Sequence, residues 1–323
     1  MMKKLFFSLV FLISTASVFA FTPKNVECIA PAGPGGGWDF TCRFPAGEVM
    51  TKLGLIPGTL RTTNMAGGGG GLAYANVVTK RAKDDNLLVA ASVATATRLA
   101  QNVFSGFTAD NVRWLGALGA DYGVIAVAKD SKYKTLNDLM DALKKDPKSL
   151  NFVGGSAAGG WDHLKVLMLA DESGVKNLKE ITYVAFDGGG PAMIELLGGR
   201  ADAFTGDTSE VLSQLDAGNI RILAVLSEKR VSRLGDAKTA KEQGLNVIGA
   251  NWRAFYAPPK MSDDAYNYWV DAIKKTAASK EWADLRDKNG LAEFESFGPE
   301  FEKFVLSQIA KVSVISKDLG LIK

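Results

Sequence analysis

Histidine and cysteine are almost absent from this sequence of 323 residues, which contains one histidine, His163, and two cysteines, Cys28 and Cys42. These counts leave too few soft ligands for a zinc or iron site. A Ser-His-Asp triad would have to use His163, which follows Asp162 at the start of an expected helix and has no nucleophile elbow near it. The sequence therefore predicts no metal centre, no cofactor and no triad hydrolase.

Long apolar runs are also missing after the start of the chain. Residues 1–20 combine two lysines, an apolar run and small residues that end in Val18-Phe19-Ala20, which is the pattern of a secretory signal peptide. We expect cleavage after Ala20. A retained membrane anchor is the lesser alternative, because the run is short and ends at a plausible peptidase site.

Neither sign of charge is in excess. Without Lys3 and Lys4 the chain carries 36 basic and 35 acidic residues. No surface rich in lysine and arginine with interleaved aromatic residues is apparent, so nucleic acid is not an expected partner. A chain of about 300 residues exceeds the usual size of one domain, and two lobes are expected.

Short apolar runs alternate with amphipathic segments along most of the chain. The runs that predict strands lie at 26–31, 59–65, 87–92, 122–128, 150–155, 181–186, 201–207 and 220–227. The segments that predict helices lie at 39–52, 72–80, 135–145, 162–173, 191–197 and 209–216. This order predicts an α/β fold with parallel sheets covered on both faces.

The last part of the chain has a different pattern. After 251–259, three helices are expected near 262–279, 281–289 and 299–317, with no strand between them. A terminal helical block commonly packs back onto the first lobe. We therefore predict lobe one at 21–122 plus 252–323 and lobe two at 123–251.

Glycine-rich segments separate expected strands from expected helices, and two of them contain the same tetrad. Gly-Gly-Trp-Asp occurs at 36–39 and again at 159–162. At such a junction the free N–H groups of the helix point beyond the sheet edge, glycine lets a ligand approach the backbone, and the helix dipole favours negative charge. One junction alone is more often a tight turn, but six together predict an anion site between two lobes. The other four junctions lie at 64–71, 92–97, 186–193 and 204–210.

The aspartates of the two tetrads, Asp39 and Asp162, would repel an anion, and we therefore expect them to cap helices and shape loops. Asp39 is also expected to pair with Arg43, four residues on. Trp38 and Trp161 either form the wall of a cleft or pack each helix on its sheet.

No lysine or arginine lies within the six junctions. Recognition of a carboxylate would then depend on backbone N–H groups, bridging water and hydroxyl groups. This composition favours a small hydroxylated or polycarboxylic acid over a phosphate ester. The hydroxyl-bearing candidates are Ser92, Thr95, Ser156, Thr205 and Thr208.

Five longer phrases span nearly the whole chain after residue 20, and they are CIAPAGPGGGWDFTCR, NMAGGGGGLAYA, GGSAAGGWDHLKVLML, VAFDGGGPAMIELLGGRADA and NWRAFYAPP. Their combination closely resembles the periplasmic substrate-binding receptors of the tripartite tricarboxylate transporter family. The resemblance implies an α/β, two-lobed, hinged type II periplasmic-binding-protein (Venus flytrap) fold, with each lobe a sheet flanked by helices. It also implies a monomeric receptor in the periplasm that delivers a small organic carboxylate to one large and one small integral membrane subunit.

The resemblance further implies where the ligand binds. The form Gly-Gly-Trp-Asp looks most like the citrate-binding branch, so a citrate-like tricarboxylate is the expected ligand. The expected ligand-binding residues are Gly35, Gly36, Gly37, Trp38, Asp39, Gly68, Ser92, Thr95, Gly155, Ser156, Gly159, Asp187, Gly189, Thr205 and Asp207.

Two other function classes compete with a transport receptor. A dehydrogenase is disfavoured, because Gly33, Gly35 and Gly37 do not have the spacing of a dinucleotide fingerprint. A sensory carboxylate receptor that signals to a membrane histidine kinase stays open, because it would use the same closure of two lobes.

The two cysteines lie close together in the sequence. Cys28 falls in the first expected strand, and Cys42 falls in the first turns of the helix that folds back over that strand. In an oxidising compartment this arrangement predicts a disulfide, and two buried thiols remain the alternative.

Overall fold

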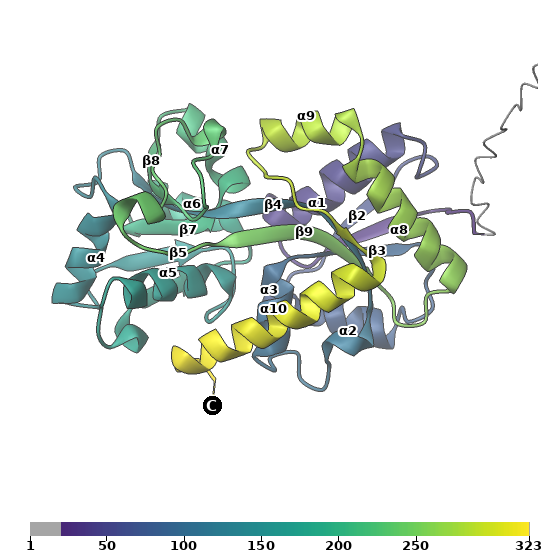
Figure 1. The fold of residues 1–323 in the computed structure, drawn as a ribbon, viewed down its shortest axis with the longest axis horizontal. Helices are drawn as coiled ribbons and strands as arrows, with labels where there is room; N and C mark the ends of the chain where they lie inside the picture. Colours follow the sequence, from purple (N-terminus) through teal and green to yellow (C-terminus); the bar gives the residue numbers. More distant parts are fainter. Residues whose placement is uncertain (1–20, 323) are drawn as a thin grey trace, which may run out of the picture.

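The strands form one sheet that runs through both halves of the molecule (Figure 1). In this computed structural model, which describes residues 21–322, the strand order is β2-β1-β3-β9-β4-β7-β5-β6, and β8 and β10 also pair with β4. The predicted signal peptide at 1–20 lies outside the described residues. None of the helices within residues 21–322 combines the length and the apolar composition of a membrane span.

Parallel strands build the outer part of each half of the sheet. β1 pairs in parallel with β2 and β3, and β5 pairs in parallel with β6 and β7. All residues of β1, β3 and β7 are buried, because helices cover both faces of the sheet (Figure 1). The bounds are β1 (Glu27–Ala30), β2 (Arg61–Asn64), β3 (Leu87–Ala91), β5 (Asn151–Gly154), β6 (Thr182–Ala185) and β7 (Ala203–Asp207).

Antiparallel strands occupy the middle of the sheet. β9 pairs antiparallel with both β3 and β4, and β7, β8 and β10 also pair antiparallel with β4. The bounds are β4 (Arg113–Ala128), β8 (Ile220–Val225), β9 (Ala250–Ala257) and β10 (Ser296–Phe297).

The partner of β4 changes in the middle of that strand. Tyr122 pairs with Ala250 of β9, and the next residue, Gly123, pairs with Asp207 of β7. We use this change to name the two parts of the sheet: the first lobe holds β1, β2, β3, β9 and β10, and the second lobe holds β5, β6, β7 and β8. The lobe limits at 122 and 251 stay a prediction.

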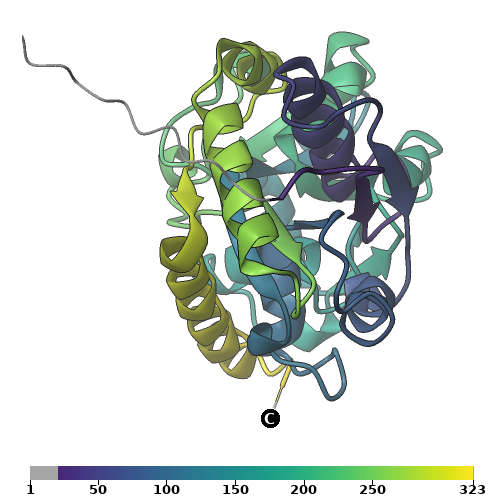
Figure 2. The same cartoon turned by 90° about the vertical axis from the view of Figure 1, so that its right-hand side faces the viewer.

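Helices lie on both faces of this sheet. The C-terminal helices α8 and α10 pack on β4, and α10 also packs along α3. Figure 2 shows α8, in light green, in front of the sheet and α10, in yellow, beside it. The bounds are α1 (Gly37–Thr41), α2 (Gly71–Thr79), α3 (Val93–Ala100), α4 (Leu136–Lys145), α5 (Trp161–Glu172), α6 (Gly189–Leu197), α7 (Thr208–Asp216), α8 (Asp263–Ala277), α9 (Lys280–Lys288) and α10 (Gly298–Asp318).

The prediction of parallel sheets was wrong for the middle of the molecule, where β9 and the first part of β4 were missed. The expectation of no strand between the last three helices was also wrong, because the short strand β10 lies between α9 and α10. β9 contains Asn251 and Arg253, whose polar side chains hide the apolar character of a buried strand. The start of β4 contains Gly116 and Gly119, which lower strand propensity. These glycines allow close packing, because a Cβ atom on Gly119 would lie 3.1 Å from the Trp282 ring.

A disulfide joins Cys28 of β1 to Cys42, the first residue of the π-helical segment Cys42–Met50 that continues α1. The two Cα atoms are 5.6 Å apart, and both side chains are fully buried. The bond closes a loop that contains the first tetrad. It therefore restrains both ends of the glycine-rich turn between β1 and α1.

Candidate functional site

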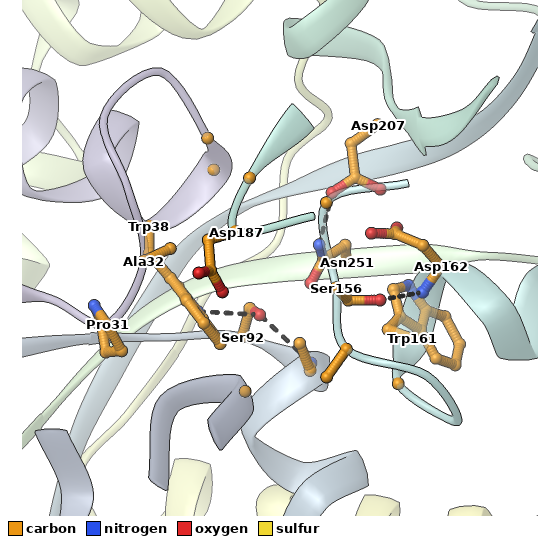
Figure 3. A pocket seen from close by; sticks show the side chains of 18 of the residues that line it. Pro31, Ala32, Trp38, Ser92, Ser156, Trp161, Asp162, Asp187, Asp207 and Asn251 are labelled. Carbon is orange, nitrogen blue, oxygen red and sulfur yellow. Dashed lines mark hydrogen bonds between the residues drawn. The ribbon is translucent and has the colours of Figure 1, made fainter. Parts of the chain in front are cut away.

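A cavity lies where the glycine-rich turns of the two lobes meet (Figure 3). The cavity is partly open to solvent, and residues of both lobes line it. All six predicted junctions contribute to its lining, because they follow the parallel strands β1, β2, β3, β5, β6 and β7. Parallel strands end at the same edge of a sheet, which is where ligands bind in open α/β folds.

The predicted ligand-binding residues divide into two groups. Those that line the cavity are Gly36, Gly37, Trp38, Ser92, Gly155, Ser156, Asp187 and Asp207. Those that do not line it are Gly35, Asp39, Gly68, Thr95, Gly159, Gly189 and Thr205. Contact of any of them with a ligand stays a prediction.

Several residues of the second group hold the lining in place. The Thr95 hydroxyl accepts a hydrogen bond from the Ser92 backbone N–H at 3.4 Å, as part of the cap of α3. The Thr205 hydroxyl donates to the backbone carbonyl of Asp162 at 3.0 Å. These side chains are buried, and their hydroxyl groups are used within the protein.

Asp39 of the first tetrad shapes its loop. One carboxylate oxygen accepts a hydrogen bond from the Gly35 N–H at 3.0 Å, and the other accepts from Asn64 Nδ2 at 2.8 Å. The Nε of Arg43 lies 2.9 Å from the carboxylate, so the predicted pair is present. The expected capping of the first helical turn is wrong, because Asp39 reaches back to an N–H group that precedes α1.

Asp162 of the second tetrad has a different partner. Its Oδ1 lies 2.9 Å from the Nζ of the buried Lys165, three residues on, and the expected capping role is therefore wrong for this residue as well. The N–H of Asp162 in the first turn of α5 donates instead to the Ser156 hydroxyl at 2.9 Å. The neighbouring His163 holds the loop, because its Nδ1 accepts a hydrogen bond from the Gly159 N–H at 3.0 Å. Burial lowers the pKa of His163 to about 4, so its ring is neutral and stacks on Tyr183 at 4.7 Å.

The tryptophans of both tetrads belong to the cavity wall. Trp38 donates from Nε1 to the Ser92 hydroxyl at 3.1 Å. The Nε1 of Trp161 has no hydrogen-bond acceptor among the described residues. The indole N–H of Trp38 is therefore fixed by a hydrogen bond, whereas that of Trp161 is unpaired among the described residues.

Arg98 of α3 lines the cavity and was not predicted from the sequence. It is 9% exposed, and no carboxylate of residues 21–322 forms an ion pair with it. One Nη donates to Gln101 Oε1 at 3.0 Å and to the carbonyl of Ala158 at 3.1 Å, while Nε has no acceptor among these residues. Burial lowers the pKa of Arg98, but a guanidinium stays protonated in proteins.

The sequence analysis placed no basic side chain in the site, because it considered only the residues of the junctions. Arg98 lies one residue beyond the junction at 92–97 and was therefore missed. A position three residues after Thr95 falls on the same helical face, and this spacing could have identified it.

A buried cluster of charged side chains forms part of the cavity lining, to which Asp207 and Arg253 contribute. Arg253 of β9 donates to Asp121 of β4 at 2.6 Å and to Asp207 at 3.0 Å. Lys165 of α5 lies 3.0 Å from Asp207 and is fully buried. Gly37 allows α1 to pack against this cluster, because a Cβ atom there would overlap the Arg253 guanidinium. Of this cluster, Asp207 alone was predicted from the sequence.

Glu210 of α7 lines the cavity beside this cluster. Its Oε2 accepts a hydrogen bond from the Asp207 N–H at 2.9 Å. Burial, together with the negative charges of Asp207 and Asp162, raises the pKa of Glu210 to about 8, although Arg253 opposes the shift. Glu210 is therefore protonated at neutral pH.

This proton has a measurable effect on stability. Because the folded pKa of about 8 exceeds the ordinary value of 4.5, the contribution of Glu210 to stability is complete below pH 4.5 and is lost as the pH rises through 8. His163 acts in the opposite direction, but only between its folded pKa of about 4 and its ordinary value of 6.5. Between pH 6.5 and 8, we expect Glu210 to lower the free energy of unfolding by up to about 1.4 kcal/mol per pH unit.

Glu210→Gln should flatten this slope, because glutamine is neutral at every pH. Urea unfolding of the ligand-free protein at pH 6.5, 7.0, 7.5 and 8.0 measures it. Glu300→Gln, at an exposed position, is the matched control and should keep the slope of the unmodified protein. Equal slopes in all three proteins would contradict a protonated Glu210.

Comparisons with known proteins agree with this architecture. Residues 57–321 match the family described as "Tripartite tricarboxylate transporter family receptor". A UPF0065 protein from the TAR-I ttuE-ttuC' intergenic region of Agrobacterium vitis is 31% identical over 283 residues, which cover 86% of this chain and 76% of that protein. Protein BugT of Bordetella pertussis is 25% identical over 256 residues, covering 76% of each chain.

Solved structures share the fold at low sequence identity. The periplasmic binding protein BugD is 22% identical, with a TM-score of 0.81 over 92% of this chain and 98% of that chain. MatC from Rhodopseudomonas palustris, solved with bound malate, is 21% identical, with a TM-score of 0.78 over 90% of this chain and 98% of that chain. These likenesses confirm the predicted fold class of a two-lobed periplasmic binding protein. The chain therefore belongs to the tripartite tricarboxylate transporter receptor family, a family of solute-binding receptors and not of enzymes.

Proposed function

We propose that this protein is a periplasmic receptor that binds a small organic polycarboxylate of the size and charge of citrate. In this proposal the receptor works as a monomer and delivers the acid to the large and small membrane subunits of a tripartite transporter. The observation that carries the proposal is Arg98, a buried guanidinium in the cavity wall without a carboxylate partner among the described residues. A buried charge is costly without a counter-ion, and a ligand carboxylate supplies one.

Backbone groups support the same class of ligand. The lining contains glycines from both lobes, among them Gly36, Gly37 and Gly155. Their lack of side chains leaves N–H groups accessible to a carboxylate, as in other anion sites at strand-to-helix turns. Together with Arg98, these donors come from two sides of the cavity, which suits an acid with more than one carboxylate.

The acidic residues of the lining limit how much negative charge the cavity accepts. Asp162 and Asp207 are paired with Lys165, and Glu210 is protonated. Asp187 is exposed and has no partner among the described residues that would neutralise its charge, and Figure 3 shows its carboxylate among the residues that line the cavity. A carboxylate at this place can accept a hydrogen bond from a ligand hydroxyl, which favours hydroxy acids such as citrate.

The relatives support a carboxylate in general. MatC was solved with malate, and a second Rhodopseudomonas palustris protein, 23% identical with a TM-score of 0.79 over 92% of this chain and 97% of that chain, was solved with adipate. The choice of a citrate-like acid depends on the repeated tetrad and on the charges described above.

A thermal-shift screen of the purified protein tests the proposal. The panel contains citrate, isocitrate, tricarballylate, malate, succinate, phosphate and glucose. At about one hundred times the dissociation constant, a ligand adds about 2.7 kcal/mol to the free energy of unfolding, so a binder gives a clear rise in Tm. Citrate and tricarballylate differ only in the hydroxyl group, and a larger shift with citrate is expected. Stabilisation by glucose or phosphate, with none by the organic acids, would reject the proposal.

A further inference from the structure

Gln101 connects the two lobes beside the cavity without lining it. This residue follows the last turn of α3 and is 9% exposed. Its Nε2 donates to the carbonyl oxygen of Gly159 in the second lobe at 2.7 Å and to the Ser316 hydroxyl of α10 at 3.2 Å. One side chain thus joins α3, α10 and the second Gly-Gly-Trp-Asp loop.

Arg98 makes a parallel contact one turn earlier on α3. Its Nη1 donates to the carbonyl of Ala158 at 3.1 Å and also to Gln101 Oε1 at 3.0 Å. Two neighbouring side chains of the first lobe therefore hold two successive carbonyl groups of the second lobe. Arg98 also lines the cavity, whereas Gln101 does not.

The loop that carries these carbonyl groups is fixed within its own lobe. Gly159 has a φ angle of +73°, which side chains other than glycine rarely adopt. Its N–H donates to His163 Nδ1 at 3.0 Å, and the His163 ring stacks on Tyr183. The carbonyl groups of Ala158 and Gly159 are thereby held in a defined direction for the side chains of α3.

The backbone conformation of Gly159, and not a lack of space, requires glycine at this position. A Cβ atom on Gly159 would lie 3.8 Å from both Arg98 Nη1 and Gln101 Oε1, which is an ordinary van der Waals distance. Any other residue would be strained by the positive φ angle, and this strain would disturb the carbonyl groups that Arg98 and Gln101 contact.

We propose that Arg98 and Gln101 form a closure latch that stabilises the ligand-bound, closed arrangement of the lobes. Arg98 belongs to the latch and to the ligand site, and Gln101 acts as a positioning residue that never touches the ligand. The latch depends on the proposed function in one respect only, which is the identity of the ligand. Because its hydrogen bonds exist only while the lobes are together, losing them speeds ligand release and leaves ligand entry unchanged.

Gln101→Met tests the latch, because methionine keeps the length of the side chain and removes both polar groups. We expect the citrate dissociation rate to rise about tenfold and the association rate to change little, since one to two hydrogen bonds are lost. Gln101→Asn, which is polar but too short to reach Gly159, is the second variant and should behave in the same way. Gln243→Met is the matched control, because the side-chain amide of Gln243 donates within the second lobe, to the carbonyl groups of Leu223 and Thr239.

A second measurement does not depend on the ligand. Spin labels on cysteines at the exposed Lys80 and Lys145, one in each lobe, report the distance between the lobes in ligand-free protein. Gln101→Met should shift the distribution toward longer distances, and Gln243→Met should not. Unchanged distances together with an unchanged dissociation rate in both Gln101 variants would overturn the latch. Failure of citrate to bind the unmodified protein would reject the proposed ligand, while the label distances would still decide on the latch.

Discussion

Replacing Arg98 by leucine is expected to weaken citrate binding at least about 30-fold, because truncating one partner of a buried, hydrogen-bonded charge pair costs about 2–5 kcal/mol. The ligand carboxylate would enter the same cavity and find backbone donors only. Isothermal titration calorimetry measures the loss directly. An affinity within threefold of the unmodified protein would show that Arg98 does not bind the ligand.

Two further observations separate a ligand-binding Arg98 from a structural one. The ligand-free Arg98→Leu protein should lose little stability, because the cost of burying a guanidinium without a counter-ion offsets its hydrogen bonds to Gln101 and Ala158. An arginine whose main role is structural would give a large fall in Tm instead. Arg98→Lys is the matched variant: it keeps the charge but lacks the planar fork that reaches Ala158 and a carboxylate together, so it should recover part of the affinity.

The position of the cavity could be predicted from the sequence for a simple geometric reason. Each glycine-rich junction follows a parallel strand, and parallel strands of one lobe end at the same edge. Six junctions therefore had to gather at two edges, and the two edges face one cavity. The prediction needed only the order of strands and helices, which depends on local periodicity.

The buried charges could not be predicted in the same way. Arg253 meets Asp121 across a separation of 132 residues, and no local pattern encodes such a pairing. Charged residues are rarely buried unless they are paired, so Asp121, Lys165 and Arg253 each look like surface residues in the sequence. The same long-range pairing concealed β9, because the apolar pattern of that strand is interrupted by Arg253.

The repeated tetrad shows a limit of reasoning from motifs. Asp39 and Asp162 occupy equivalent positions, yet Asp39 pairs with the half-exposed Arg43 and Asp162 pairs with the buried Lys165. The residues that follow each tetrad determine the partner, because side chains three or four positions apart meet on a helix. The tetrad therefore specifies the turn and its place at the cavity. The residues of the helix that follows determine which basic side chain pairs with the aspartate.

The buried lysine gives the largest expected effect on stability. Lys165 is fully buried, and its Nζ lies 2.6 Å from the Gly206 carbonyl, 2.9 Å from Asp162 and 3.0 Å from Asp207. Lys165→Met keeps most of the volume and removes the charge. We expect the free energy of unfolding at pH 7.5 to fall by about 3–5 kcal/mol, because two carboxylates then lose a buried counter-ion.

The loss should depend on pH in a defined direction. In the unmodified protein Lys165 and Arg253 hold the pKa of Asp207 below its ordinary value, although burial alone would raise it. Without Lys165 that pKa rises, so the stability lost on substitution is largest where Asp207 is ionised in both proteins and decreases as the pH falls and Asp207 of the variant takes up its proton. The difference from the unmodified protein should therefore be smaller at pH 5 than at pH 7.5 in urea unfolding. Lys275→Met, which removes an exposed lysine paired with Asp271, is the control and should cost no more than about 0.5 kcal/mol at either pH. If Lys165→Met behaved like this control, Asp162 and Asp207 would not depend on a buried counter-ion, and the charges of the cavity lining would not form a paired cluster.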